Sequence, residues 1–589
     1  MISPTSTKLR VLQALLFLVA LAWPAVAQKT PDKSAIDSLY KQGIRSLQQG
    51  DLDAARADFE KFVRLAPNSP EGHNSLGWVL MSTGKIDDAI PQFRIALRLN
   101  TDFLQAHINL ANALAAKGEK DAAVNEARIA VRLAPGEAEA HRALGRALSF
   151  QHELDAAVAE LRQASQLDPQ RPDLHDELGV LLVQNSQFEP AALEFTEALR
   201  LQPRSAAAKL HLGLLRWQQR SLDDAAQLLQ SAVELAPDNA QAHFYLASVR
   251  ADRADWEGAI QEWMAAVRIR PDFPEAQTKL GLALQRKGDA VGAVSAFRQV
   301  TRTQPDNADA HNNLGLALIQ SGDAPGAVPE FEAALRLKPA DSDYRGNLGI
   351  AYLQRADFEA AIRELRAALQ GAPDDATLHY NLGLALKLKD DLPAAIVELQ
   401  KAAKLDPGQP DAHYTLGVIF WQQGEFASAA DELGAAIKAR PDYAEAHYTL
   451  GTVLKQQGKL QDAANALREA IRLQPDFAGA HITLAGVLRQ LGDTEGASAE
   501  SKLGAEIAKG ANALQAATFS TNSGRRLLNA GDLDGAISQF RSATGQLGSY
   551  APAHFYLAQA LRRKGLPNEA EREFQKASEL DPHFKSASE

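Results

Sequence analysis

The chain has 589 residues, of which 46% are hydrophobic and 23% charged, which is typical of a folded protein and excludes an intrinsically disordered one. Its 62 lysines and arginines against 73 aspartates and glutamates give a net charge of -11, which argues against a nucleic-acid partner. Cysteine is absent, so disulfides, thiolate metal ligands and cysteine nucleophiles are excluded.

The first 27 residues have the pattern of a secretory signal peptide. Lys8 and Arg10 precede an apolar run from Val11 to Trp23, and Ala25-Val26-Ala27 provides the small-x-small cleavage pattern. The run is about 13 residues long, whereas a helix needs roughly 20 to cross a bilayer. We expect cleavage after Ala27, export to the periplasm or the medium, and no stable membrane insertion of the mature chain. An uncleaved N-terminal anchor is the alternative.

After a lead-in at 28–35, the sequence repeats with a period of 34 residues. Fourteen repeats fill 36–511 in continuous phase, a five-residue insertion occupies 512–516, and two repeats fill 517–584 before a tail at 585–589. With residue 36 as position 1, glycine or alanine stands at position 8 and alanine at position 20 in all sixteen repeats. Proline recurs at position 32, without slippage, at Pro169, Pro203, Pro237, Pro271, Pro305, Pro339, Pro373, Pro407, Pro441 and Pro475.

This pattern resembles the tetratricopeptide repeat, a helix-turn-helix unit of 34 residues. The resemblance implies an all-α fold, a right-handed α-solenoid of about sixteen helix pairs. Positions 7, 8 and 11 share one face of the first helix, helix A, and positions 20, 24 and 27 share one face of the second, helix B. Small residues at positions 8 and 20 are expected to let the two helices approach closely. Glycine at position 15 in ten repeats predicts a turn, and proline at position 32 ends helix B.

The pattern weakens between repeats 14 and 15. Ser501, Gly504 and Lys509 stand where an apolar residue, alanine and proline are expected, and the insertion follows at 512–516. We therefore expect a break in the repeat geometry near 500–516. Either a mobile hinge or a rigid junction is consistent with the sequence.

Histidine recurs at position 4 in eleven repeats, but no member has the i, i+4 partner of a helical zinc site. The resemblance places a bulky aromatic residue there, so we expect the imidazoles to fill space between helices. No metal, cofactor or catalytic residue is predicted.

A candidate binding strip follows the helix A positions expected to face the concave side of repeats 9–14. Three consecutive repeats carry asparagine at position 6, followed by threonine: Asn313, Asn347, Asn381, Thr415 and Thr449. Tyrosine occupies position 5 at Tyr380, Tyr414 and Tyr448. Position 12 carries Lys387, Trp421, Lys455 and Arg489.

An asparagine amide both donates and accepts, so it matches a peptide backbone of any sequence. The asparagine row resembles the ladder in the repeat domain of O-linked N-acetylglucosamine transferases, which binds extended peptides; the resemblance covers the repeats and not the catalytic domain. Aromatic and cationic residues are frequent at binding hot spots. The alternative is that the tyrosines pack into the seams between repeats.

The sequence therefore predicts a non-enzymatic scaffold for partner proteins or extended peptides, and the resemblance is compatible with envelope assembly, secretion or exopolysaccharide machinery. Two alternatives stay open. One is a repeat-containing subunit of a glycosyltransferase system, and the other is a carbohydrate-binding periplasmic spacer.

Overall fold

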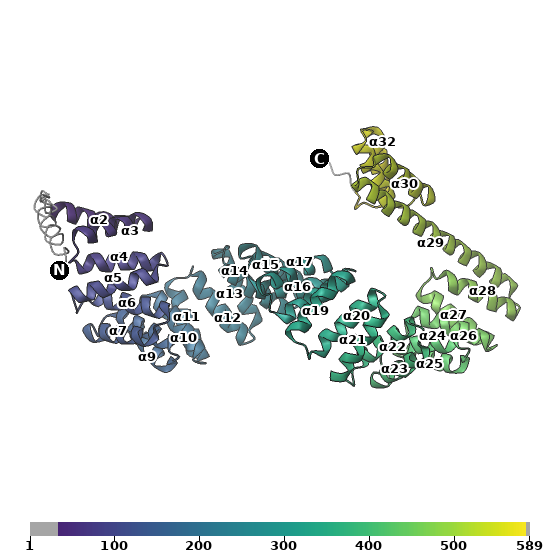
Figure 1. The fold of residues 1–589 in the computed structure, drawn as a ribbon, viewed down its shortest axis with the longest axis horizontal. Helices are drawn as coiled ribbons and strands as arrows, with labels where there is room; N and C mark the ends of the chain where they lie inside the picture. Colours follow the sequence, from purple (N-terminus) through teal and green to yellow (C-terminus); the bar gives the residue numbers. More distant parts are fainter. Residues whose placement is uncertain (1–32, 585–589) are drawn as a thin grey trace, which may run out of the picture. The chain divides into compact units, whose positions relative to one another are not determined.

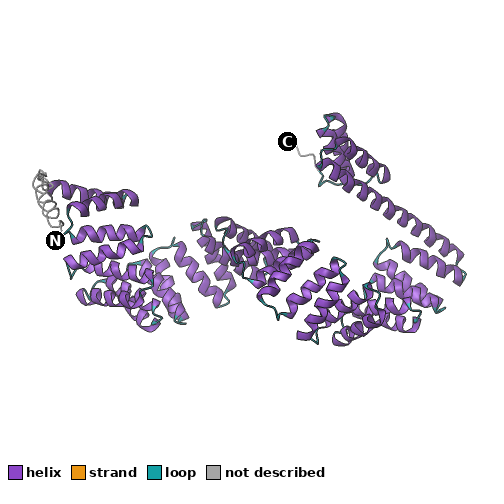
Figure 2. Ribbon diagram, viewed as in Figure 1, coloured by secondary structure: helices purple, strands orange, loops and turns teal. Residues whose placement is uncertain are grey.

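The computed structural model describes residues 33–584, so the predicted signal peptide lies outside the described residues. The described part is helical throughout, with 31 helices and no strand (Figure 2). The expected all-α solenoid of helix pairs is thereby confirmed. None of the helices within 33–584 combines the length and the apolar character needed to cross a membrane. The chain divides into two compact bodies, residues 1–287 and 288–589.

The N-terminal body alternates A and B helices (Figure 1). Its A helices are α2 (Lys33–Gln48), α4 (Pro70–Ser82), α6 (Leu104–Lys117), α8 (Ala138–Phe150), α10 (Pro172–Gln184), α12 (Ala206–Gln218), α14 (Ala240–Asp252) and α16 (Pro274–Lys287). Its B helices are α3 (Leu52–Leu65), α5 (Ile86–Leu99), α7 (Lys120–Leu133), α9 (Leu154–Leu167), α11 (Phe188–Leu201), α13 (Leu222–Leu235) and α15 (Trp256–Ile269). Each helix from α2 to α15 packs against the next one in the chain.

The C-terminal body begins with the B helix α17 (Ala290–Thr303) and follows the same alternation. Its A helices are α18 (Ala308–Gln320), α20 (Ser342–Gln354), α22 (Ala376–Leu388), α24 (Pro410–Gln422), α26 (Ala444–Gln456), α28 (Ala478–Leu491) and α31 (Ala551–Arg563). The B helices are α19 (Ala324–Leu337), α21 (Phe358–Gly371), α23 (Leu392–Leu405), α25 (Phe426–Ala439), α27 (Leu460–Leu473), α30 (Leu533–Gln546) and α32 (Pro567–Leu580). One further helix, α29 (Thr494–Asn529), contains both the B helix of repeat 14 and the A helix of repeat 15.

The core of each repeat lies between its two helices. Ala395, at position 20, and Leu399, at position 24, are fully buried on α23. A Cβ atom on Gly383, at position 8 of α22, would lie 2.6 Å from Leu399 Cγ and 3.3 Å from the Ala395 carbonyl oxygen. The small residue at position 8 therefore makes room for the side chain at position 24 as well as for the backbone at position 20.

The turn between the two helices has the same backbone conformation in all sixteen repeats. Position 15 has a positive φ in every repeat, including the six in which it is not glycine. Those six are His152, Ser186, Arg220, Ala254, Ala356 and Asp390. The two helices therefore fix the conformation of the turn that joins them. The six residues that carry a Cβ atom adopt the left-handed conformation there, although it is sterically unfavourable for them.

The junction between repeats 14 and 15 is a continuous helix. The 36 residues of α29 run through the insertion at 512–516, so helix B of repeat 14 continues into helix A of repeat 15 without the turn that separates other repeats (Figure 1). Lys509 stands where proline ends most other B helices, and the alanine-rich sequence that follows favours helix. The middle of α29 is exposed and carries Leu503 and Leu514 at 44% and 46% exposure. This stretch is helical but has little packing around it.

Candidate functional site

The three asparagines of the predicted strip are half-buried but differ in their contacts. Asn347 Nδ2 donates to Asn312 Oδ1 on the preceding A helix at 2.9 Å. Asn381 Nδ2 donates to the carbonyl oxygen of Thr377, one turn earlier in α22, at 2.9 Å. Asn313 has no side-chain hydrogen bond within residues 33–584. Asn313 therefore keeps its full amide, whereas Asn347 and Asn381 keep their oxygens, for a ligand.

The two threonines that continue this row are committed inside their own helices. Thr415 and Thr449 are buried, each with 5% exposure. Their hydroxyls donate to the carbonyl oxygens of Asp411 and Glu445 at 2.7 and 2.8 Å. The hydroxyls of these two threonines therefore do not extend the asparagine row as hydrogen-bond donors to a ligand.

Two of the three tyrosines of the strip pack against aromatic residues at the ends of their own repeats. Tyr414 contacts Tyr443, with ring centroids 5.0 Å apart, and Tyr448 contacts Phe477 at 4.7 Å. Burial, reinforced by the negative charge of Asp411, raises the pKa of the Tyr380 hydroxyl. All three tyrosines are half-buried, so each fills a seam and still presents part of its surface.

The position 12 row keeps its charges unpaired. Lys387 is half-buried on α22, and burial lowers the pKa of its ammonium group. Within the described residues, neither Lys387 nor Lys455 has an ion-pair partner, and Arg489 is exposed. Trp421, between the two lysines in the repeat order, packs partly against buried residues of α25 and α26. This row therefore offers cations and an indole to an incoming group.

Sequence reasoning missed a set of lateral contacts between successive A helices. Position 5 of one repeat meets position 6 of the next, 35 residues later. Paired side chains with complementary groups are Tyr40 and Ser75 at 3.1 Å, Asn74 and Asn109 at 2.9 Å, Asp176 and His211 at 2.9 Å, and Asn312 and Asn347 at 2.9 Å. A search for complementary polar residues 35 positions apart would have found them.

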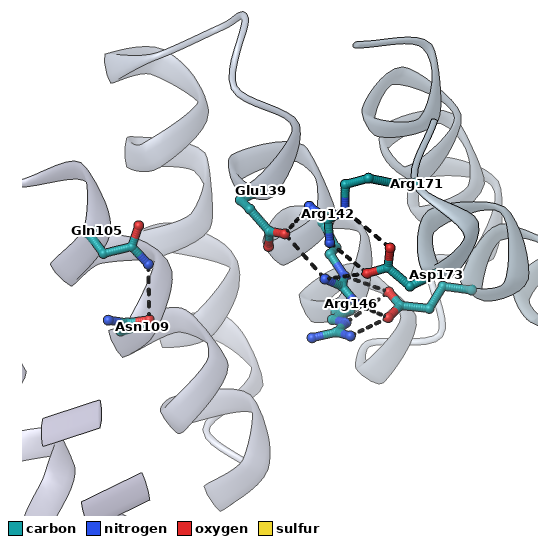
Figure 3. A network of polar contacts seen from close by, with 8 residues as sticks. Gln105, Asn109, Glu139, Arg142, Arg146, Arg171 and Asp173 are labelled. Atoms are coloured by element: carbon teal, nitrogen blue, oxygen red, sulfur yellow. Dashed lines mark hydrogen bonds and ion pairs between the residues drawn. The ribbon is translucent and has the colours of Figure 1, made fainter. Parts of the chain in front are cut away.

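The largest of these lateral contacts is a charge network on α8 and α10. Arg142 lies between Glu139 and Asp173, with Nη1 3.2 and 3.1 Å from their carboxylates (Figure 3). Arg142 and Arg146 both donate to Glu177. Burial opposes the ionised form of Glu177, but these two hydrogen bonds outweigh it and hold the pKa of the carboxyl below its usual value. The charges in the network are mutually neutralised, so this part of the face has a structural role.

The position 4 histidines do more than fill space. In nine repeats Nδ1 lies 2.5–2.6 Å from the carboxylate of a glutamate 19 residues later, at position 23 of helix B. In most of them Nε2 also contacts a carbonyl oxygen six residues earlier, as His379 does with Pro373 at 2.9 Å. In repeat 10, Arg345 makes the equivalent two contacts, to Glu364 and to the Pro339 carbonyl. Each such residue links helix B to the preceding loop.

No group of three histidines, aspartates or glutamates that could hold a metal ion is found in residues 33–584. The polar side chains of the strip are amides, hydroxyls and cations set on the faces of successive helices. This arrangement suits recognition of an extended ligand by many weak contacts.

Family comparison agrees with the geometry. One model of the tetratricopeptide repeat matches residues 40–102, 74–138, 108–172, 177–240, 278–342, 448–503 and 521–583, which together exceed half of the chain. The chain belongs to the tetratricopeptide repeat family. Two further models of this repeat match 248–288, 388–424 and 419–458, and 318–387.

Several solved structures resemble the chain at low identity. A chain of the APC/C heterotetramer Cut9–Hcn1 is 15% identical, with 89% of this chain and 96% of that chain covered and a TM-score of 0.36. PilF of Pseudomonas aeruginosa is 20% identical, with 35% and 94% covered and a TM-score of 0.33. YrrB, described as a TPR protein with an unusual peptide-binding site, is 24% identical, with 33% and 97% covered and a TM-score of 0.27. No curated protein sequence matches the chain.

Proposed function

We propose that this tetratricopeptide repeat protein is an exported, non-enzymatic scaffold that binds extended peptide segments of partner proteins. Tetratricopeptide repeats are protein-interaction modules, which supports the general role. The proposed site is the strip on α18, α20, α22, α24, α26 and α28.

The observation that carries this proposal is the half-buried ammonium group of Lys387. Within the described residues it has no carboxylate partner, although a buried charge is stabilised mainly by a partner. It shares α22 with Asn381, whose amide oxygen is not engaged by the contact to Thr377. A partner segment would supply a carboxylate or carbonyl oxygen to Lys387 and a backbone N–H to Asn381.

The binding energy expected of such a strip is modest at each point. One hydrogen bond contributes about 0.5–1.5 kcal/mol net, whereas micromolar affinity corresponds to about -8 kcal/mol. Several repeats must therefore act together, with the half-buried tyrosines supplying apolar contact. A long partner segment satisfies this requirement better than a compact one.

The test uses the full mature chain as bait in the envelope fraction, followed by direct binding of the recovered partner's peptides. The variant carries Asn381→Ala and Lys387→Gln, which remove the proposed contacts without removing a core side chain. We expect it to lose at least tenfold in affinity for those peptides. Peptide and glycan arrays, probed in parallel, should show binding to peptides and not to glycans.

Lys438→Gln provides the matched control, because Lys438 is an exposed lysine on the B helix α25, outside the strip. This control should bind like the wild type. Unchanged affinity of the double variant, or binding to glycans in place of peptides, would contradict the proposal. The export component is tested separately by the N-terminus of the mature protein, which is expected to be Gln28.

A further inference from the structure

The N-terminal body contains a pocket that lies outside the strip proposed above. It has a volume of about 410 Å³ and is formed by residues of α12, α14, α15 and α16. Its apolar wall includes Trp217, Phe244, Trp256, Trp263 and Leu282. A volume of this size lies within the range of pockets that hold small molecules or large side chains.

The aromatic wall is open to a ligand. Trp217, Phe244 and Trp256 are half-buried, and Leu282 is 43% exposed in the absence of a ligand. Trp263 is buried, and its indole Nε1 has no acceptor in the described residues. Buried donors without an acceptor are uncommon in folded proteins, so packing alone leaves this wall incomplete. Large apolar groups gathered around an open pocket are typical of a binding anchor.

The rim of the pocket is positively charged. Lys279 and Arg286, both exposed on α16, have no hydrogen-bond or ion-pair partner within residues 33–584. The guanidinium carbon of Arg286 lies 4.3 Å from the centre of the Trp256 ring, so the cation is held over the aromatic wall.

The acidic side chain in this lining, Asp252, is already engaged. Its Oδ2 accepts a hydrogen bond from Trp217 Nε1 at 2.7 Å and lies 3.7 Å from Arg220. The two unpaired cations therefore dominate the rim, in a chain whose net charge is -11.

We propose that this pocket binds a partner segment in which a bulky apolar side chain is flanked by acidic residues. The apolar side chain enters between Trp217, Trp256 and Leu282, and the flanking carboxylates pair with Lys279 and Arg286. A basic segment would be repelled by the same cations, and a neutral apolar ligand would leave both of them unpaired. Such a site is independent of the C-terminal strip, because no residue is shared between them.

The probe is a capped 11-residue peptide with a central phenylalanine flanked on each side by two glutamates in a Gly/Ser background. Three companion peptides carry glutamine flanks, lysine flanks, or a central alanine between glutamates. Affinity for the full mature chain is measured by fluorescence anisotropy. Tryptophan emission reports on the pocket, because Trp217, Trp256 and Trp263 are three of the six tryptophans of the chain.

We expect saturable binding of the Glu-Phe probe with a change in tryptophan emission. The glutamine-flanked peptide should bind at least fivefold more weakly, and the alanine-centred peptide at least tenfold more weakly. Lys279→Glu combined with Arg286→Glu should reverse the preference toward the lysine-flanked peptide. Leu282→Asp, at an exposed position, should lower the affinity for the Glu-Phe probe by tenfold or more. The circular dichroism spectrum of this variant should match that of the wild type.

Arg268→Glu is the matched control, since Arg268 is an exposed cation on α15 outside the pocket lining. It should bind the probe like the wild type, as should the Asn381→Ala/Lys387→Gln variant of the strip. Four results would overturn the proposal: no saturable binding of the Glu-Phe probe, equal affinity for glutamate and glutamine flanks, equal affinity for the alanine-centred peptide, or equal loss in Arg268→Glu and the rim variant.

Discussion

His107 Nδ1 lies 2.6 Å from Glu126 Oε2, and His107 Nε2 lies 2.9 Å from the carbonyl oxygen of Thr101. A carboxylate and a carbonyl oxygen both accept hydrogen bonds, and a neutral imidazole has one N–H to donate. Only the protonated imidazolium satisfies both contacts. The same geometry recurs at most position 4 histidines, and Arg345 reproduces it with a permanent cation.

This geometry predicts a stability that depends on pH. Burial disfavours the charged form of His107, but the hydrogen bonds to Glu126 and Thr101 and the charges of Glu126 and Asp102 outweigh it, so the pKa is raised above 6.5. A raised folded pKa gives a stabilisation that is fully present below the unfolded pKa and is lost as pH rises through the folded pKa. We expect the urea midpoint to fall as pH rises above about 6.5.

Glu126→Gln separates this effect from general alkaline destabilisation. His73 already pairs with a glutamine, Gln92, at 2.8 Å, so the substitution keeps an acceptor at the same place. In the variant, NMR titration should show a lower pKa for His107 than in the wild type. An unchanged titration curve would show that the carboxylate is not what stabilises the imidazolium.

A second prediction concerns the stability of the protein at acidic pH, to which Glu177 contributes. Its carboxyl has a lowered pKa, so its contribution is present above the ordinary value near 4.5 and is lost as pH falls through the folded pKa. Glu177→Gln should lower stability at pH 7 by about 1–2 kcal/mol, since hydrogen bonds from Arg142 and Arg146 lose their charged acceptor. Urea unfolding at pH 7 and pH 4 measures both effects, and the difference between the two proteins should shrink at pH 4.

A third prediction concerns the core of repeat 11. Ala395 is fully buried on α23, close to Gly383 of the partner helix. Ala395→Leu should destabilise this repeat by about 1–3 kcal/mol through overpacking. Hydrogen exchange of 376–405 should accelerate, because the stability of a repeat array is approximately a sum of local terms. Ala427→Leu, at an exposed position of α25, is the control and should leave exchange nearly unchanged.

A fourth prediction follows from the turn between the helices. Ala356 has a φ of 59°, in the left-handed region, whereas ten other repeats have glycine at this position. Ala356→Gly should stabilise the protein by up to about 1 kcal/mol, because it relieves the strain of the Cβ atom. Gly458→Ala, the reverse change at φ 74°, should destabilise by a similar amount. Urea midpoints of the two variants should shift in opposite directions.

A fifth prediction concerns α29. Its middle is helical but exposed, so its amides are hydrogen-bonded without the packing that protects other helices. We expect residues 505–516 to exchange faster than α27. Exchange as slow as in α27 would exclude local opening at this junction and, with it, the hinge that the sequence left open.

The junction shows where sequence reasoning was incomplete. The insertion at 512–516 and the missing proline at Lys509 were visible, and they predicted a break in the pattern. The structure interrupts the pattern with one continuous helix, because a segment without a stop signal and rich in alanine continues as helix when no turn is required. A departure from the repeat pattern therefore located the irregularity but did not define its conformation.

The candidate strip was predictable only in part. Its positions follow from the repeat, and within residues 33–584 the structure leaves the Asn313 amide, the Asn381 amide oxygen and the Lys387 ammonium group without a side-chain partner. The engagement of Thr415 and Asn347 was not predictable, because a repeat position specifies a face of the helix and not the hydrogen-bond partner. The pocket in the N-terminal body was missed because its tryptophans lie on both A and B helices.

The sequence by itself determined the repeat and the all-α fold. In a solenoid the packing that defines the fold occurs within a repeat and with its neighbours, so a pattern such as small residues at positions 8 and 20 is sufficient to specify it. Only the tertiary structure decided which polar groups on adjacent helices satisfy each other, as Arg142 and Glu177 do, and which, like Lys279 and Lys387, have no ion-pair partner within residues 33–584. That distinction depends on side-chain distances across helices 34 or more residues apart, which no single repeat encodes.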